Sequence, residues 1–293
     1  MKRIIFSLIA LLCCLGSVFA KGSDQIHRIM TVNIRVTGLP EDEKSGLRWS
    51  DRRDVCVEAI KREKPDIVCA QEVIYDSYQY LKDKLKGFAA FGFEGPEMDP
   101  YTEGYHLIAK NVIYYNTKRY EMVGGGSYWL SEKPLEGGSM SWGTTRARHC
   151  NYLRLRDRKT GRQFRVLNVH LDHKSDEARK QQMEMIVEEC EQYAKNFPQI
   201  MCGDFNSGIK DRPSQVLRAA GWHEMWETIH GQKEFGFTAH AFKGINYKPK
   251  NVRRIDFIYY HGDVTPLSSR VIDETIKGIY PSDHYFLVAS FKL

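Results

Sequence analysis

The chain has 293 residues, of which 42% are hydrophobic and 27% are charged, and its formal net charge is +6. This length and composition exclude an intrinsically disordered protein and allow a sizeable core in one large domain or two small ones. The positive charge suits an anionic substrate, but it is too small to identify a nucleic-acid-binding protein by itself.

The N-terminus carries the pattern of a targeting signal. Lys2 and Arg3 precede an almost wholly apolar run from Ile4 to Val18, and Val18-Phe19-Ala20 offers small residues before a cleavage site. We expect a secretory signal peptide over residues 1–20, export to the periplasm or beyond the cell, and no transmembrane segment after cleavage. A retained membrane anchor is the alternative, although the apolar run is short for a span.

Two of the seven cysteines lie in this leader and five follow it. An odd number of cysteines cannot pair completely within one chain. Cys69 and Cys202 lie inside apolar runs, so we expect buried free thiols there. No cysteine spacing typical of a zinc site occurs.

Strand-like apolar runs alternate with helical patterns along the chain. The first half predicts strands at 28–34, 66–70, 106–115, 127–130, 151–156 and 164–170, with helices at 51–62 and 74–85. The second half predicts a helix at 177–195, a strand at 199–202, a helix at 213–220, and strands at 254–260, 269–272 and 285–291. We expect Ser50 or Asp51 to cap the helix at 51–62. No linker divides the chain, so we predict one domain over residues 21–293, with two packed sheets covered by helices in an α/β sandwich.

Short polar fragments stand at the ends of these apolar runs. They are Asn33, Gln71-Glu72, Asn168-Val169-His170, Gly203-Asp204-Phe205-Asn206, Asp256 and Ser282-Asp283-His284. Each fragment alone has an ordinary explanation as a turn, a helix cap or a buried histidine. Together they offer the hard oxygen ligands and the acid–base groups that a magnesium-dependent phosphoester hydrolase needs. Asp256 lies in an apolar run and therefore needs a partner, for which His284 is suitable.

These fragments, taken in order, resemble the endonuclease/exonuclease/phosphatase superfamily. The resemblance runs from Met30-Thr-Val-Asn33 to Tyr280-Pro-Ser-Asp-His284, and Tyr128-Trp-Leu-Ser-Glu-Lys-Pro134 is similar to the secreted bacterial branch. It implies a four-layer α/β/β/α sandwich of two packed mixed sheets flanked by helices.

The resemblance also implies roles for individual residues. Asn33, Glu72 and Asp283 are the expected ligands of Mg²⁺ or Mn²⁺. The expected catalytic residues are His170, Asp204, Asn206, Asp256 and His284. In this scheme Asp204 and Asn206 orient or deprotonate the attacking water, and Asp256 holds His284. The expected substrate-binding residues are Arg148, Asn168, Trp142 and His240, although His240 fits a surface loop equally well.

One position departs from the family pattern, because Arg35 stands where several nucleases of the family have an acidic residue. A second metal contact there is therefore not expected. The leading function is that of an exported metal-dependent phosphodiesterase or nuclease. The alternatives are a phosphatase or phospholipase-like enzyme acting on sugar, inositol or sphingolipid phosphates, and a non-catalytic binding protein with this fold. The expected partner is the phosphoester substrate, which includes nucleic acid, and no obligate protein partner is evident.

Overall fold

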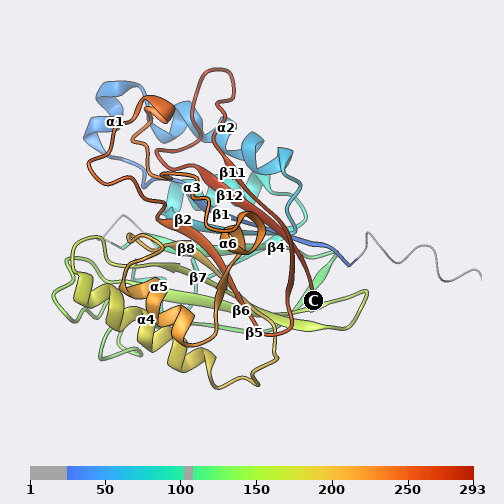
Figure 1. Ribbon diagram of the computed structural model, residues 1–293. Coiled ribbons are helices and arrows are strands. Elements are labelled where there is room, and N and C mark those ends of the chain that lie inside the picture. The colour runs from blue at the N-terminus through green and yellow to red at the C-terminus, as the bar shows by residue number, and fades with distance from the viewer. Residues whose placement is uncertain (1–24, 102–107) are drawn as a thin grey trace, which may run out of the picture.

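The computed structural model describes residues 25–101 and 108–293, and two six-stranded sheets form its centre (Figure 1). The expected signal peptide and the start of the strand expected at 106–115 lie outside the described residues. In the described part of the chain, no helix is long and apolar enough to cross a membrane.

The first sheet has the strand order β11-β12-β1-β2-β4-β3. Its strands are β1 (His27–Asn33), β2 (Ile67–Val73), β3 (Phe88–Phe91), β4 (Lys110–Asn116), β11 (Thr265–Ile272) and β12 (Phe286–Lys292). The second sheet has the order β5-β6-β7-β8-β10-β9. Its strands are β5 (Tyr120–Trp129), β6 (His149–Asp157), β7 (Gln163–His170), β8 (Gln199–Asp204), β9 (His223–Glu224) and β10 (Asp256–His261).

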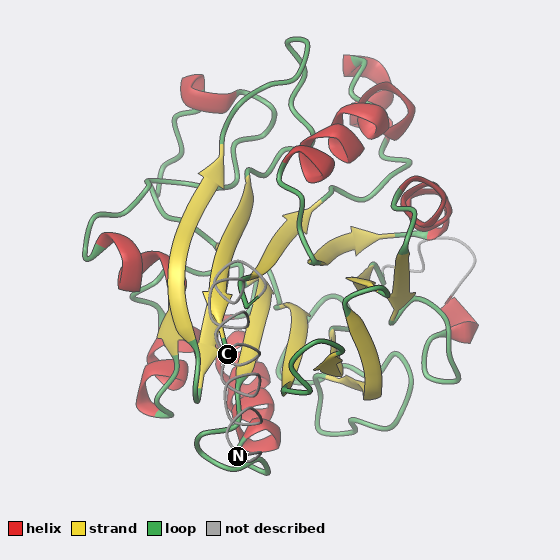
Figure 2. Ribbon diagram, turned by 90° about the vertical axis from the view of Figure 1, so that its right-hand side faces the viewer, coloured by secondary structure: helices red, strands yellow, loops and turns green. Residues whose placement is uncertain are grey.

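Helices cover the outer faces of both sheets, so the molecule has four layers, and Figure 2 shows the strands in the centre with helices around them. The α-helices are α1 (Pro40–Ser45), α2 (Trp49–Arg62), α3 (Tyr75–Lys84), α4 (Asp176–Cys190), α5 (Arg212–Ala219) and α6 (Met225–His230). Two 3-10 turns, η1 (Asp99–Tyr101) and η2 (Gly244–Asn246), complete the described elements. The predicted four-layer α/β/β/α architecture is confirmed.

Three apolar clusters hold the layers together. Ile60 of α2 and Leu81 of α3 pack on the outer face of the first sheet, and Ile186 of α4 and Leu217 of α5 pack on the second. Between the sheets, alternate strand residues such as Ile113 interdigitate in a third cluster. All five cysteines after the leader are buried and free, which confirms the prediction for Cys69 and Cys202.

The strand directions bring several strand ends to one edge of the sandwich. β1 runs parallel to β2 with Asn33 opposite Gln71, and β7 runs parallel to β8 with His170 opposite Asp204. β10 is antiparallel to β8, so its first residue, Asp256, pairs with Asp204. Residues far apart in the sequence therefore meet where these four strands end and β10 begins.

Several element boundaries differ from the sequence-based expectation; β5 and β11, for example, begin at Tyr120 and Thr265, before the predicted starts at 127 and 269. Helix α2 begins at Trp49, so the N-cap residue is Arg48 and not Ser50 or Asp51. Asp51 takes part from the third helical position, where its carboxylate accepts from the Arg48 backbone N–H. Helix α4 ends at Cys190, several residues earlier than predicted, because the Gln199 side chain donates to the Cys190 carbonyl there. Strand β2 continues through Val73 and so carries Gln71-Glu72 within the strand, beside a bulge.

Candidate active site

The Asp204 carboxylate stands at the centre of the polar cluster. Its Oδ2 accepts a hydrogen bond from Asn33 Nδ2 at 3.0 Å, and it lies 3.4 Å from His170 Nε2 and 4.0 Å from His284 Nε2. Its Oδ1 accepts from the Asn206 backbone N–H at 2.8 Å. One buried carboxylate therefore joins groups from both sheets.

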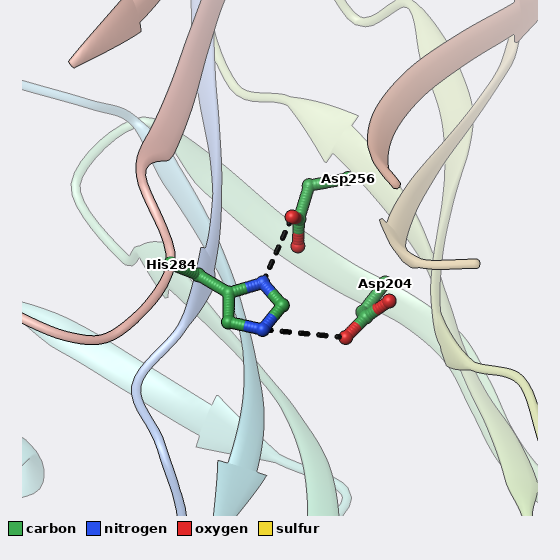
Figure 3. A group of neighbouring side chains, drawn as sticks. All are labelled: Asp204, Asp256 and His284. Carbon is green, nitrogen blue, oxygen red and sulfur yellow. Dashed lines mark hydrogen bonds and ion pairs between the residues drawn. The ribbon is translucent and has the colours of Figure 1, made fainter. Parts of the chain in front are cut away.

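His284 lies between two carboxylates (Figure 3). Its Nδ1 is 2.9 Å from Asp256 Oδ2, which directs Nε2 toward Asp204. The Thr238 hydroxyl accepts from the Asp256 backbone N–H and so helps to fix the start of β10. The expected pairing of Asp256 with His284 is present in the structure.

The two histidines next to Asp204 differ in charge. Burial opposes protonation of His284, but Asp256 and then Asp204 raise its pKa well above the usual value. Burial, with Arg148 and His284 nearby, instead lowers the pKa of His170 well below its usual value. At neutral pH, His284 is therefore a cation and His170 is neutral.

Asp204 itself is a poorly stabilised carboxylate. Burial and the neighbouring Asp256 raise its pKa to about 7, against the opposing effect of His284. A carboxylate with a pKa near neutrality exchanges protons readily at physiological pH. Ligand atoms of Asp204, Asp256 and His284 lie within 4.8 Å of one another, a spacing that a metal ion could also bridge. The Asp256–His284 hydrogen bond favours proton handling by these three residues.

Glu72 occupies the neighbouring part of the site in a left-handed backbone conformation with φ 63°. Its Oε2 accepts from the Val36 backbone N–H at 2.6 Å, and its Oε1 accepts from Asn33 Nδ2 at 3.2 Å. A side chain in this conformation is strained, and such strain is concentrated at functional sites. The Asn33 amide thus joins Glu72 to Asp204.

Asp283, an expected metal ligand, has another partner. Its Oδ2 lies 2.7 Å from Arg35 Nη1, and the same guanidinium donates through Nε and Nη2 to both oxygens of Asp42 at 2.7 Å. Arg35 therefore hydrogen-bonds to Asp283 on one side and to Asp42 on the other, where the exposed Glu41 also lies 3.6 Å from Nη2. Asp283 belongs to this ion-pair cluster beside the catalytic centre.

Three further candidates, Arg148, Asn206 and Trp142, are buried or half-buried. Arg148 is 6% exposed, its Nε has no hydrogen-bond partner among the described residues, and Asp204 and Glu72 are its main electrostatic neighbours. Asn206 stands beside Asp204 and donates from Nδ2 to the Leu171 carbonyl at 3.0 Å. Trp142 is half-buried, and its carbonyl accepts from the Ser175 hydroxyl.

Asn168 and His240 are both fully buried. Both amide hydrogens of Asn168 bind carbonyls of the first sheet, so this fully buried side chain joins the two sheets. His240 is not a surface histidine, because it is fully buried and stacks on Tyr285 at 4.1 Å. Its backbone N–H donates to the Asp283 carbonyl at 2.7 Å, so it supports the segment that carries His284.

Sequence reasoning missed Arg35, Asp42 and Thr238 as parts of the site. The sequence identified Arg35 only as a basic residue at a position where several nucleases of the family have an acidic one. Nothing in the spacing marks Asp42 as the partner of Arg35. Thr238 lies two residues before His240, and nothing in the sequence marks its hydroxyl as part of the site.

Comparisons with known proteins agree with this fold and cluster. The family model described as "Endonuclease/Exonuclease/phosphatase family" matches residues 30–284. Nocturnin of Homo sapiens is 25% identical over 294 residues, which cover 90% of this chain and 64% of that protein. Nocturnin of Drosophila melanogaster is 23% identical over 292 residues, which cover 87% of this chain and 44% of that protein. The chain thus spans less than two thirds of the length of these relatives.

Solved bacterial structures share the fold along most of the chain. An endonuclease/exonuclease/phosphatase from Bacteroides vulgatus has a TM-score of 0.78 at 25% identity, covering 92% of this chain and 99% of that one. A mannosyl-6-phosphatase from Bacteroides thetaiotaomicron has a TM-score of 0.80 at 22% identity, covering 91% and 100%. Since the family model spans most of the sequence, the chain belongs to the endonuclease/exonuclease/phosphatase family of phosphoester hydrolases.

Proposed function

We propose that this protein is an exported, metal-dependent hydrolase of phosphoester bonds, with phosphodiesters as its first substrate class. The observation that carries the proposal is the central place of Asp204. Its carboxylate accepts a hydrogen bond from Asn33 and lies between a neutral His170 and a cationic His284. This arrangement provides a proton acceptor and cationic donors around one point. Attack of water on phosphorus needs both of these groups.

The residues present fit a divalent cation. Glu72, Asp204 and Asp256 gather negative charge in a buried region, and this excess is one reason that the pKa of Asp204 rises. Glu72 would hold the ion, because its Oε1 has one long contact, from Asn33 Nδ2 at 3.2 Å, among the described residues. Asn33 would contribute its Oδ1, which here accepts from the Arg35 backbone N–H at 3.0 Å. Asp283 fits this role less well because Arg35 already binds it. The ion would supply Lewis-acid stabilisation of charge on the phosphoryl oxygens.

The chain's own side chains account for the remaining chemistry. Asp204 accepts the proton of the attacking water, assisted by its nearly neutral pKa. Cationic His284, held by Asp256, donates from Nε2 to a phosphoryl oxygen, and buried Arg148 adds a second positive charge. Neutral His170 has a single N–H, and its Nε2 lies 3.4 Å from Asp204, so it donates either to that carboxylate or to a substrate oxygen in its place. These donors are preorganised by burial, which strengthens their electrostatic effect.

Phosphomonoesters are the second candidate class, on a specific observation. Arg148 forms no ion pair with a described residue and is almost fully buried, so its charge favours an anion richer in charge than a diester. The mannosyl-6-phosphatase of similar fold is named for a substrate of this class. Export is the other finer part of the proposal, motivated by the leader pattern at residues 1–20.

A substrate panel on the purified mature protein tests the proposal. It would contain bis-p-nitrophenyl phosphate, p-nitrophenyl phosphate, DNA, RNA, inositol phosphates and sphingomyelin, each with Mg²⁺, with Mn²⁺ and with a chelator. We expect hydrolysis of at least one phosphoester that the chelator abolishes. Activity that is unchanged by exhaustive metal removal, or no hydrolysis of any member, would refute it. N-terminal sequencing of protein from the native envelope fraction tests export, with a start near Lys21 expected and an intact Met1 against it.

A further inference from the structure

The side chains that fill the space between the two sheets change from apolar to polar toward the catalytic edge. Ile67, Val166 and Ile200 belong to the apolar cluster between the sheets. Alternate residues of a strand share a face, so the side chains that continue this layer toward the catalytic edge include amides and a carboxylate. Each of these is at most 2% exposed: Asn33, Gln71, Asn111, Asn151, Asn168 and Asp204. A buried polar layer therefore lies between the apolar core and the site.

The amides of this layer connect strands of the first sheet to strands of the second. Three pairs of strands are joined by one side-chain hydrogen bond or more. The bonds are Asn33 Nδ2 to Asp204 Oδ2 (β1 to β8) at 3.0 Å, Gln71 Nε2 to Asn168 Oδ1 (β2 to β7) at 2.6 Å, and Asn151 Nδ2 to the Asn111 carbonyl (β6 to β4) at 2.6 Å. The sheets are thus held together by hydrogen bonds at the edge where catalysis is expected.

The connection between Gln71 and Asn168 uses every polar atom of the Asn168 side chain. Its Nδ2 donates to the carbonyls of Ala70 and Val112, both at 3.0 Å, and its Oδ1 accepts from Gln71. Both amide side chains are fully buried. If Gln71 lost its amide, Asn168 Oδ1 would be left buried without its donor, which is unfavourable.

Gln71 and Asn168 stand close in sequence to the residues of the proposed chemistry. Gln71 directly precedes Glu72, and Asn168 lies two residues before His170. In the parallel register of β7 and β8, His170 pairs with Asp204. The hydrogen bond between the two amides therefore joins the segment with the expected metal ligand to the segments with the expected proton acceptor.

The backbone around Gln71 makes this side-chain contact important for the position of Glu72. The pairing of β2 with β4 is interrupted between Ala70 and Val73, and Gln71 and Glu72 are the two residues inside the interruption. Glu72 also has a left-handed backbone conformation. A bulge disrupts the ladder locally, so hydrogen bonds to β4 do not fix Glu72. The bond from Gln71 to Asn168 supplies a fixed point within the bulge.

We propose that Gln71 is a positioning residue, whose hydrogen bond to Asn168 sets the place of Glu72 relative to His170 and Asp204. The inference rests on the proposed function, because that function gives Glu72 and Asp204 their roles. Gln71 is fully buried, so it acts through the alignment of other groups and not by contact with substrate. Misplacing reacting groups by about 1 Å can lower a rate by about 10²-fold.

Gln71→Met tests this role, because it removes the amide and keeps the length of the side chain. We expect kcat on bis-p-nitrophenyl phosphate to fall about tenfold. Mg²⁺ affinity by calorimetry and KM should stay within about twofold of the native values, because Glu72 and Asn33 both belong to the first sheet and move together. Gln71→Asn, which keeps an amide but withdraws it from Asn168, should show the same loss of kcat and replaces Gln71→Met if that variant does not fold.

Thr31→Val is the matched control. Thr31 is the other side chain that Gln71 binds, at 3.1 Å, and it lies in the same sheet as Gln71. The control should lower the urea midpoint but leave kcat unchanged, because it keeps the bond between Gln71 and Asn168. A native kcat in both Gln71 variants, or an equal loss of kcat in Thr31→Val, would overturn the positioning role.

Hydrogen–deuterium exchange separates failure of this inference from failure of the proposed function, because it needs no turnover. The Val36 N–H binds Glu72 and the Asn206 N–H binds Asp204, so peptides 33–38 and 204–209 report on the two sides of the site. We expect faster exchange in both peptides for the Gln71 variants and native exchange for Thr31→Val. This result would support the inference even if every phosphoester assay were negative. Native exchange in both peptides of the Gln71 variants would overturn it.

Discussion

The two sheets bring matching pairs of parallel strands to the catalytic edge, but the pairs carry different chemistry. In the first sheet, β1 and β2 present Asn33 and Glu72, and the Glu72 carboxylate is half-buried and bound by a backbone N–H. In the second sheet, β7 and β8 present His170 and Asp204, which are both buried and which titrate far from their usual range. The first pair is suited to hold a cation and the second to move a proton.

Strands β12 and β10, the antiparallel neighbours of β1 and β8, connect the two halves of the site. His284 precedes β12 in the first sheet, yet its ring is bound by Asp256 of β10 in the second. A site built at the meeting of two sheets can thus separate metal binding from proton transfer while one hydrogen bond aligns them. The predictions below test how completely the two functions are separated.

The largest loss is expected when either carboxylate is neutralised. Asp204→Asn removes the proton acceptor, and Glu72→Gln removes the expected metal ligand. We expect each to lower kcat on bis-p-nitrophenyl phosphate by about 10³-fold, within the range for acid–base groups. Circular dichroism should show an intact fold in both. If Asp204→Asn kept a turnover near that of the native enzyme, Asp204 of the second sheet would not be the proton acceptor.

A smaller loss of kcat is expected when either member of the Asp256–His284 pair, which joins the two sheets, is replaced. Asp256→Asn and His284→Ala should each lower kcat by roughly 10²-fold. The double variant should be little worse than either single one, because residues that act as a unit are not additive. His170→Ala should worsen the Asp256→Asn enzyme further, since it acts on a different oxygen. Fully multiplicative losses for Asp256 and His284 would show that they act separately.

Arg35→Met tests the ion-pair cluster on the first-sheet side. It leaves the mostly buried carboxylates of Asp42 and Asp283 without their shared guanidinium, so we expect about 2 kcal/mol of lost stability and roughly tenfold lower kcat. Urea denaturation and steady-state kinetics measure the two effects. Arg62→Met, which breaks the exposed ion pair with Glu58, is the control and should change neither. If Arg35→Met behaved like the control, Asp283 would be free to serve as a metal ligand.

The smallest effect is expected at the opposite edge, where His27 begins β1. Burial and Arg119 lower its pKa from 6.5 to about 3. The unfolded chain therefore gains a proton below pH 6.5 that the folded chain refuses until about pH 3, so stability falls as pH drops through this window. Relative to the native protein, His27→Phe should recover about 2 kcal/mol of this loss between pH 7 and pH 5. Urea denaturation at the two pH values measures it. Tyr120→Phe, which removes only the hydroxyl bonded to His27, should keep the pH dependence.

The sequence predicted the parts of this molecule that depend on local pattern. The central strands and the long helices were recovered because apolar periodicity reports burial. The short elements α1, α6, β3 and β9 were missed, since a few residues carry too little pattern. The end of α4 was also misplaced, because it depends on a side chain from Gln199 on the next strand.

The site residues also divide into those that local motifs predict and those whose environment depends on contacts between distant segments. Asn33, Glu72, His170, Asp204, Asp256 and His284 were predicted from motifs at strand ends, and the structure brings them together. The environment of Asp283 could not be predicted, because it depends on Arg35 reaching across from the segment that follows β1. Asn168 matched a motif yet joins the sheets, since spacing cannot tell which face of a strand is covered by a second sheet.

Calorimetric titration of Mg²⁺ into the native protein, Glu72→Gln and Asp204→Asn tests the division of chemistry between the two sheets most directly. Both variants remove one negative charge from the same cluster, so they are matched in charge and differ only in position. We predict that Glu72→Gln loses most of its Mg²⁺ affinity, whereas Asp204→Asn binds Mg²⁺ within a few-fold of the native protein. Equal loss of affinity in both variants, or loss in Asp204→Asn alone, would contradict this account.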